Sequence, residues 1–145
     1  MPDHEPKRSS SVREADRHER VREAHALETA EDYAETIAQI IAESGRCRVV
    51  DLSRHFGVSH VTVSRTIGRL VRDGYVMTEP YRPIELTAEG RKLARLARHR
   101  HETVVRFLLA LGLDAQTAEF DAEGIEHHVS PKTLRAFGRF ADQNG

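Results

Sequence analysis

Cysteine is almost absent from this sequence, and so is any excess of charge of one sign. The 145 residues include one cysteine, Cys47, and carry a formal net charge of -1. A single cysteine cannot close an internal disulfide or build a thiolate metal site, so a bound metal would be held by oxygen and nitrogen. We therefore expect a reducing, cytoplasmic setting. The near-neutral charge argues against a generally basic nucleic-acid coat, so DNA binding would have to come from a local patch.

Long apolar stretches are missing as well. No apolar run approaches the roughly 18 residues that cross a membrane, and the charged N-terminus lacks the apolar segment of a secretory signal. We expect no membrane contact. The sequence has instead a large share of charged residues of both signs, at 31%, and nine histidines. Those in its last third are His99, His101, His127 and His128.

Residues 1–30 are predicted to form a flexible N-terminal extension. Met1–Ser11 is polar and contains two prolines, which is typical of disorder. Val12–Thr29 is rich in Arg, Glu, Ala and His and could be helical, but its apolar residues are few and small, which favours a solvated, fraying segment. The alternative is an arm that covers a partner subunit or touches DNA, although its mixed charges weaken the DNA version.

Residues 31–92 are predicted to form a winged helix-turn-helix. A first helix, Glu31–Ser44, has apolar residues at helical spacing. A short helix over 49–56, a turn at Gly57 and a longer helix over His60–Asp73 follow in the order of a helix-turn-helix, with the preceding serine as cap. The residues expected to form the shared apolar core are Leu52, Phe56, Val58, Val63, Ile67 and Leu70.

The second helix of this motif presents small polar and basic side chains. Serine and threonine at the front of a helix can reach base edges or phosphates, and arginines behind them can pair with guanine or phosphate. The alternative is an ordinary surface helix. The residues expected to contact DNA here are Ser59, His60, Thr62, Ser64, Arg65 and Arg69.

Two alternating stretches then predict a small β-hairpin wing. They lie at 75–79 and 84–87, and the tight loop Pro80–Pro83 joins them. This arrangement places Arg82 at the loop tip, where it can meet a phosphate. From residue 46 to residue 87, seven arginines stand against four acidic residues, so the module is locally basic within a neutral chain.

Residues 93–145 are predicted to form an all-helical dimerisation and metal-binding domain. A long helix begins after Thr87, and its wide apolar surface is too large for this short chain to cover, so we expect a homodimer. Two further helices are expected, over Gln116–His128 and Lys132–Asp142. The predicted fold is therefore mainly α, with a winged helix-turn-helix followed by a helical domain.

The stretch Asp121–His128 has the spacing of a metal site. In a helix, Glu123 lies three residues before Glu126 and four before His127, which places two carboxylates and an imidazole on one face. Such a set suits a divalent ion such as Mn²⁺, Fe²⁺ or Zn²⁺. A solvated acidic face with surface histidines is the alternative, because E-x-x-E-H is a short pattern.

Three other residues have weaker cases on their own. Asp32 and Glu35 lie in the first turn of a helix, where acidic side chains favour the macrodipole and need no ligand. His101 lies in the middle of the long helix, where a histidine is more often a surface or packed residue than a ligand.

The motifs in this order resemble the metal-dependent repressors of the diphtheria toxin repressor family, and look closest to its manganese-responsive branch. They are D-x-x-E in the first helix, T-V-S-R-T in the helix-turn-helix, then T-A-E-G, R-H-E, and D-A-E-G-I-E-H-H-V followed by S-P. The likeness covers about residues 30–142.

The resemblance implies a transcriptional regulator of manganese homeostasis genes and not an enzyme. It implies Mn²⁺ as corepressor, with two neighbouring ions per subunit bridged by carboxylates, and Fe²⁺ or another divalent ion as the alternative. The implied ligands are Asp32, Glu35, His101, Glu123, Glu126 and His127. The implied partner of the homodimer is a palindromic operator in double-stranded DNA. The recognition-helix positions that relatives use correspond to Ser59, Thr62, Ser64 and Arg65.

Two rival functions follow from the same residues. One is a winged-helix regulator that responds to Fe²⁺ or Zn²⁺ at the same cluster, or to a small organic molecule. In the case of an organic molecule, the acidic cluster would have no role in sensing. A metal-dependent hydrolase could use Glu126 as its base, but a third of the chain forms a helix-turn-helix and no substrate cleft is evident. We therefore expect no enzymatic activity.

Overall fold

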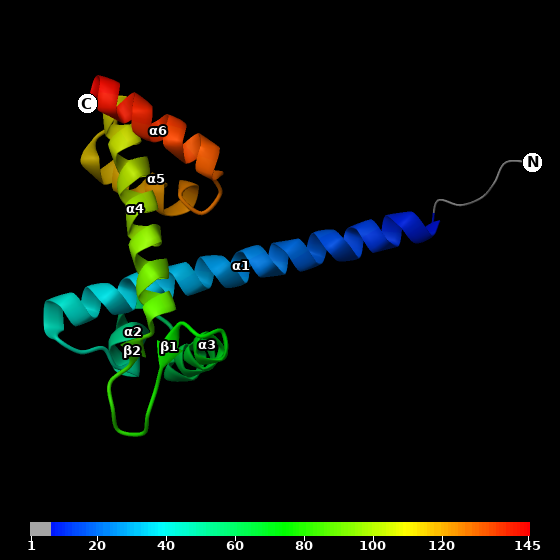
Figure 1. Ribbon diagram of the computed structural model, residues 1–145, viewed down its shortest axis with the longest axis vertical. Coiled ribbons are helices and arrows are strands. Elements are labelled where there is room, and N and C mark those ends of the chain that lie inside the picture. Colours follow the sequence, from blue (N-terminus) through cyan, green and yellow to red (C-terminus); the bar gives the residue numbers. More distant parts are fainter. Residues whose placement is uncertain (1–6) are drawn as a thin grey trace, which may run out of the picture. The chain divides into compact units, whose positions relative to one another are not determined.

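The structure, a computed structural model, describes residues 7–145. The described residues divide into two compact units between Ala30 and Glu31. Over the described residues, the chain forms six helices and one antiparallel pair of short strands (Figure 1). A mainly helical chain with a small hairpin confirms the predicted fold class. The predicted domain bounds stay predictions.

Helix α1, Lys7–Ser44, is longer than the helix predicted to begin at Glu31. Its first part is helical despite few apolar residues, because Arg, Glu and Ala are good helix formers. The expectation of disorder is therefore wrong for Lys7–Ser11, and for residues 1–6 it lies outside the described residues. The flexibility of the extension stays a prediction. In the second unit, Tyr33 and Ile37 are the buried apolar stripe of α1.

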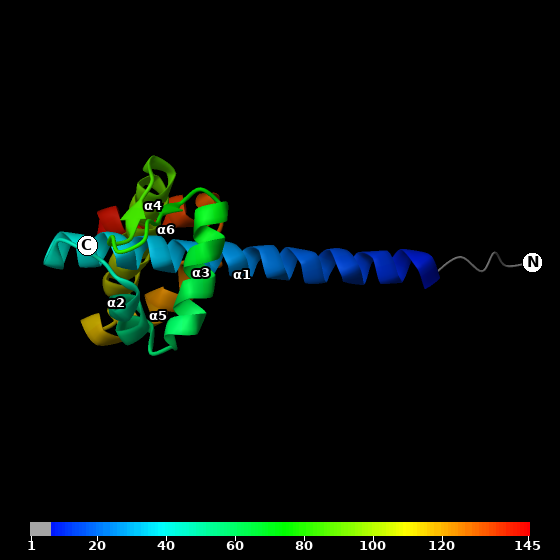
Figure 2. The same ribbon diagram turned by 90° about the horizontal axis from the view of Figure 1, so that it is seen from below.

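Helices α2, Val49–Phe56, and α3, His60–Arg72, form the predicted helix-turn-helix. The turn requires Gly57 because its φ of 65° lies in the left-handed region. Ser59 caps α3 as predicted, since its side chain accepts a hydrogen bond from the Thr62 backbone N–H at 3.2 Å. Figure 2 shows α3 with α2 beside it.

Four of the six predicted core residues of this motif are buried: Leu52, Val63, Ile67 and Leu70. The other two are not. Phe56 is partly buried and stacks on Tyr33 of α1, with ring centroids 4.5 Å apart. Val58 is exposed because it lies in the turn between the helices rather than on either apolar face. The stacking of Phe56 fixes α1 to the helix-turn-helix.

The wing is made of strands β1, Val76–Met77, and β2, Glu85–Leu86, paired antiparallel. Both strands are shorter than predicted, so the connection runs from residue 78 to residue 84 and is not a tight turn. Pro80 and Pro83 lie in this connection, and proline cannot donate to a strand ladder. The Ile84 N–H instead donates to the Cys47 carbonyl at 2.8 Å, which fixes the returning end of the wing.

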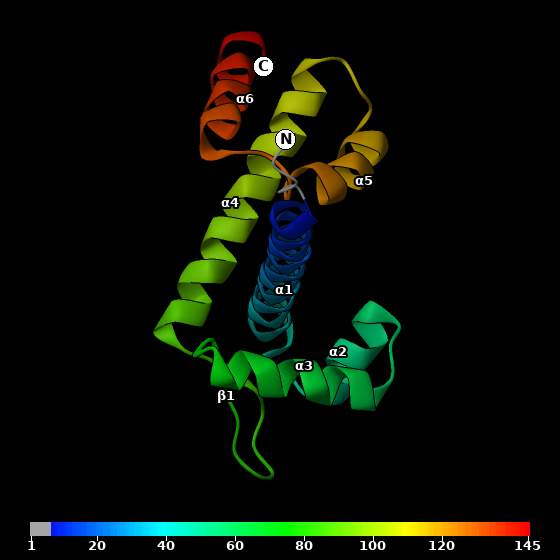
Figure 3. The same ribbon diagram turned by 90° about the vertical axis from the view of Figure 1, so that its right-hand side faces the viewer.

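Helix α4, Ala88–Ala110, begins against the wing. Thr87 caps it, accepting from the Gly90 N–H at 3.0 Å and donating to the Gly74 carbonyl at 2.6 Å. A Cβ at Gly90 would lie 2.0 Å from the Tyr75 carbonyl oxygen, so only glycine allows this approach. The first turn of α4 is therefore held against the residues between α3 and β1, and Figure 3 shows α4 running from the helix-turn-helix to α5 and α6.

Helices α5, Ala115–Ile125, and α6, Pro131–Asn144, pack on the far end of α4. Their buried core is Val104, Leu108, Ala118 and Ala122. Helix α5 ends three residues before its predicted end, and α6 continues two residues past its predicted end. Several apolar side chains on or directly after α4, α5 and α6 stay exposed, including Leu109, Leu111, Phe120 and Phe140. Over the described residues, none of the helices has the length and apolar character needed to cross a membrane.

Candidate metal centre and DNA-binding surface

Two groups of possible metal ligands meet at Glu126, directly after α5. One group is Asp32, Glu126 and His127, and the other is His101, Glu123 and Glu126. Within each group the candidate ligand atoms lie within 4.8 Å of one another. Ligands about 2.1 Å from one octahedral ion lie about 3 to 4.2 Å apart, so both groups fit an ion after small side-chain adjustments. Glu126 is only 3% exposed, and it belongs to both groups.

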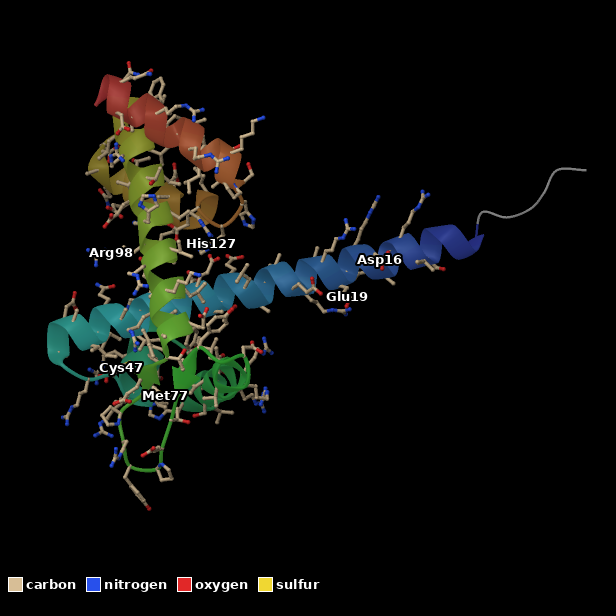
Figure 4. All side chains as sticks on the ribbon, viewed as in Figure 1. Asp16, Glu19, Cys47, Met77, Arg98 and His127 are labelled. Carbon is tan, nitrogen blue, oxygen red and sulfur yellow. The ribbon has the colours of Figure 1, made fainter. Side chains whose placement is uncertain are left out.

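The first group joins α1 to the turn after α5. The His127 Nε2 atom lies 3.2 Å from Asp32 Oδ1 and 3.4 Å from Glu126 Oε1. Figure 4 labels His127, whose side chain is 5% exposed. The Glu126 N–H still donates to the Ala122 carbonyl at 3.0 Å, so Glu126 keeps the helical direction although α5 ends at the residue before it.

The second group joins α4 to α5. The His101 Nδ1 atom lies 2.5 Å from Glu126 Oε2 and 3.7 Å from Glu123 Oε1. The hydrogen bond to Glu126 is the main cause that raises the pKa of His101 to about 9, against the lowering effect of burial. The protonated imidazole of His101 offsets part of the negative charge of these carboxylates. A divalent ion that binds to the Nδ1 atom would have to displace the proton from it.

Glu35 on α1 is the sixth predicted ligand, and it lies beside these groups without belonging to either. Burial raises the pKa of Glu35, and the negative charge of Glu126 raises it further. Glu35 also lines a cavity of about 780 Å³ together with His101 and Glu123. The structure therefore brings all six predicted residues to one place, from α1, α4 and the end of α5. Their roles as ligands stay predictions.

The donor set fits a hard or borderline divalent ion. It consists of four carboxylates and two imidazoles, and oxygen and nitrogen donors of this kind suit Mn²⁺, Fe²⁺ and Zn²⁺. Cys47 belongs to neither group. Its thiol is buried, and burial together with the charge of Asp51 raises its pKa to about 11.

Three charged residues around the cluster were not predicted from the sequence. Glu31 Oε2 lies 3.2 Å from His127 Nδ1 and 2.9 Å from a guanidinium nitrogen of Arg100. Glu119 Oε2 lies 2.8 Å from His101 Nε2. Glu31 and Arg100 are each the direct neighbour of a predicted ligand in the sequence, but no spacing rule distinguishes them from surface charges.

The predicted DNA-contacting side chains share the exposed side of α3. The Val63, Ile67 and Leu70 side chains are buried on the opposite side. The exposed residues are Ser59, His60, Thr62, Ser64, Arg65 and Arg69. The Ser59 hydroxyl is hydrogen-bonded to both the backbone N–H and the hydroxyl of Thr62. Its first role is therefore to cap the helix.

The wing presents Arg82 and Tyr81 at its exposed connection. Arg82 forms an ion pair with Glu79 at 3.3 Å, but its side chain is 75% exposed. Its guanidinium is therefore accessible to a phosphate. Tyr81 is 99% exposed and has a φ of 65°, an uncommon conformation for a residue other than glycine. The sequence predicted the place of Arg82 but not the conformation of Tyr81. The roles of these residues in DNA binding stay predictions.

Two family descriptions together match most of the chain. Residues 25–84 match "Iron dependent repressor, N-terminal DNA binding domain", and residues 87–144 match "Iron dependent repressor, metal binding and dimerisation domain". The chain belongs to the iron dependent repressor family. This result confirms the predicted relationship to metal-dependent repressors.

Curated relatives of this repressor are similar over most of its length. "Transcriptional regulator MntR" of Salmonella typhimurium is 47% identical over 125 residues, which is 86% of this chain and 80% of that protein. "HTH-type transcriptional regulator MntR" of Bacillus subtilis is 36% identical over 108 residues, 74% of this chain and 76% of that protein. The repressor is thus a metal-dependent transcriptional regulator and not an enzyme, so the hydrolase alternative is not supported.

Solved structures agree on the fold of this repressor. A "Manganese-dependent transcriptional repressor complex with manganese" is 27% identical with a TM-score of 0.69, and the match covers 78% of this chain and 52% of that chain. The manganese regulator SloR, at 24% identity and a TM-score of 0.68, shares the fold over 78% of this chain and 53% of its own. The repressor spans about half the length of these solved relatives.

Proposed function

We propose that this repressor responds to Mn²⁺ and controls manganese homeostasis genes in the cytoplasm. The observation that carries the proposal is the pair of ligand groups that meet at buried Glu126. Both groups contain only carboxylate oxygens and imidazole nitrogens, a set without the soft thiolates that favour other metals. The Salmonella and Bacillus relatives named MntR, and the solved manganese-dependent repressor in complex with manganese, support the same ion.

We infer two neighbouring Mn²⁺ ions per subunit, since Glu126 offers a different oxygen to each ligand group. The His127 Nε2 atom lies near its Oε1 atom and also near Asp32, whereas the His101 Nδ1 atom lies near its Oε2 atom and near Glu123. Glu35 completes the proposed ligand set. Bound ions would supply the positive charge that neutralises these carboxylates and hold the donor atoms at fixed separations. Fe²⁺ and Zn²⁺ are the competing ions to test.

The ligands come from both functional parts of the repressor. Asp32 and Glu35 belong to α1, which also packs into the DNA-binding part through the Tyr33–Phe56 stack. His101 lies on α4, and the remaining ligands lie at the end of α5. Four carboxylates at this junction repel one another, so their neutralisation favours one relative orientation of the two parts. Coupling of this kind is typically about 1–3 kcal/mol, and operator DNA must tighten Mn²⁺ binding by the same factor.

A homodimer on a palindromic operator is the proposed DNA-binding form. Two-fold operators need recognition helices about 34 Å apart or a multiple of that spacing, which a fixed dimer can supply. Exposed Leu109, Leu111 and Phe120 on the helical part support burial against a second copy. The side chains proposed to contact DNA are Ser59, His60, Thr62, Ser64, Arg65, Arg69 and Arg82.

Operator binding as a function of metal tests this function. An operator is selected from random duplexes with the Mn²⁺-loaded protein, and its affinity is then titrated with Mn²⁺, Fe²⁺ and Zn²⁺ and with chelator. We expect Mn²⁺ to strengthen binding by about 5- to 150-fold. Asp32→Asn should abolish the response, whereas Glu102→Gln, in an exposed pair with Arg98, should keep it. An operator affinity that is the same in Mn²⁺ and in chelator contradicts the proposal.

A further inference from the structure

Both candidate imidazole ligands are held between two kinds of carboxylate. One ring nitrogen of each faces the carboxylates of the proposed metal centre. The other ring nitrogen faces a carboxylate that belongs to neither ligand group, Glu31 for His127 and Glu119 for His101. We name Glu31 and Glu119 the outer carboxylates.

At His127, the outer contact is buried and has its own counter-charge. Glu31 Oε2 lies 3.2 Å from His127 Nδ1, and both side chains are only 5% exposed. Arg100 donates to the same oxygen at 2.9 Å from α4. A buried carboxylate is costly unless it is paired, and Arg100 supplies the pairing charge for Glu31. The Nε2 atom on the other side of the ring faces Asp32 and Glu126.

At His101 the two ring nitrogens have exchanged roles, and the outer contact is more open to water. The Nδ1 atom faces Glu126 and Glu123, and the Nε2 atom lies 2.8 Å from Glu119 Oε2. The Glu119 side chain is 60% exposed, so water competes for its oxygens. Over the described residues, no arginine is paired with Glu119 as Arg100 is with Glu31.

We propose that Glu31, backed by Arg100, and Glu119 are positioning residues of the metal centre. An ionised carboxylate can only accept a hydrogen bond, so it places the single N–H of a neutral imidazole on the outer nitrogen. The inner nitrogen, Nε2 of His127 and Nδ1 of His101, then presents its lone pair to the metal. The proposal rests on the proposed metal centre. It adds to that centre the residues that fix which ring nitrogen binds and how each ring is oriented.

The two outer carboxylates should differ in strength. Loss of a partner that orients a ligating histidine typically costs 10- to 100-fold in metal affinity. Glu31 is buried and held by Arg100, so Glu31→Gln should weaken Mn²⁺ binding by about 10-fold or more. Glu119 is mostly exposed, so Glu119→Gln should weaken it by only about threefold.

The experiment compares these variants in the full chain. Mn²⁺ dissociation constants are measured by competition with a chelator of known affinity for Glu31→Gln, Arg100→Gln, their double variant and Glu119→Gln. The matched control is Arg98→Gln, because Arg98 is on the same helix and pairs with an exposed glutamate, Glu102. If Arg100 acts through Glu31, the double variant should bind Mn²⁺ no more weakly than Glu31→Gln alone.

A spectroscopic readout separates positioning from general damage. Loading with Cd²⁺, a diamagnetic divalent ion, allows ¹⁵N spectra of labelled histidine to report which ring nitrogen binds the metal. We expect Nε2 for His127 and Nδ1 for His101 in the wild-type protein, and a mixed or altered signal for His127 in Glu31→Gln. Thermal unfolding in chelator shows whether the variants fold. If Glu31→Gln does not fold, Glu119→Gln still tests the proposal.

Three outcomes are distinguishable. Weak binding in the Glu31 variant with an altered His127 signal supports the proposal. Wild-type Mn²⁺ affinity in both outer-carboxylate variants, or metal bound through His127 Nδ1, overturns it while leaving the metal centre intact. A wild-type protein that binds no Mn²⁺ overturns the proposed function itself and this proposal with it.

Discussion

Glu126→Gln should disturb both proposed metal sites with a single substitution. The two carboxylate oxygens of Glu126 face different histidines, Oε1 toward His127 and Oε2 toward His101. Loss of its charge therefore removes an anionic donor from both ligand groups. Asp32→Asn and Glu123→Gln each remove a donor from one group only. We expect Glu126→Gln to lose both high-affinity ions, and each of the other two variants to lose one.

The magnitude follows from the place of Glu126 in the centre. Loss of an outer partner costs up to about 100-fold in metal affinity, and loss of a shared anionic ligand should exceed that, or more than about 2.7 kcal/mol per site. The free energy of unfolding of the metal-free protein should change less. The amide oxygen in the variant can still accept from His101, so only the charge assistance of this hydrogen bond is lost, about 1 kcal/mol. Relief of the repulsion that raises the pKa of Glu35 offsets part of this cost.

Isothermal titration with Mn²⁺ measures the number of ions bound and their affinities, and urea unfolding in chelator measures the free energy of unfolding. The matched control is Glu102→Gln, an exposed glutamate that belongs to neither ligand group. The idea of a shared ligand is wrong if Glu126→Gln still binds the wild-type number of ions with wild-type affinity. It is also wrong if Asp32→Asn removes every ion.

Three further predictions concern pH, packing and thiol chemistry. Because the pKa of His101 is raised to about 9, its proton must leave on metal binding, so Mn²⁺ affinity in titrations from pH 7 to 9 should rise by up to about 10-fold per pH unit and level off above. A flat profile would refute this. Gly90→Ala should cost about 1–3 kcal/mol in urea unfolding through its clash with the Tyr75 carbonyl, whereas Gly138→Ala should be tolerated. Cys47, buried and with a pKa of about 11, should resist thiol reagents at pH 8 in the folded protein and react in denaturant; fast labelling of folded protein would contradict the structure.

Local signals explain which parts of the fold were predictable. The turn between α2 and α3 was predicted because Gly57 and Ser59 act through their immediate neighbours, as a left-handed residue and a helix cap. The wing was predicted with strands that were too long, because alternation of apolar and polar residues does not show how far the pairing extends toward the loop. The early part of α1 was not predicted as helix, since a charged segment with few apolar residues has no buried stripe to reveal it.

The candidate site shows a similar division. Glu123, Glu126 and His127 were found because three candidate ligands about one helical turn apart leave a pattern in the sequence. The outer carboxylate Glu31 left no such pattern. Its partners lie 69 and 96 residues away in the chain, at Arg100 and His127, and only folding brings them together.

Consecutive residues on one turn of α1 contact different parts of the repressor. Asp32 turns toward His127 in the proposed metal centre, while Tyr33 stacks on Phe56 in the helix-turn-helix. An α-helix rotates by about 100° per residue, so inserting or deleting one residue in this turn would misplace both side chains at once. Exchange of one side chain can therefore change one of these contacts without the other, whereas a change in the length of the segment cannot. Lineages descended from such a repressor should keep this turn free of gaps even where the rest of α1 varies.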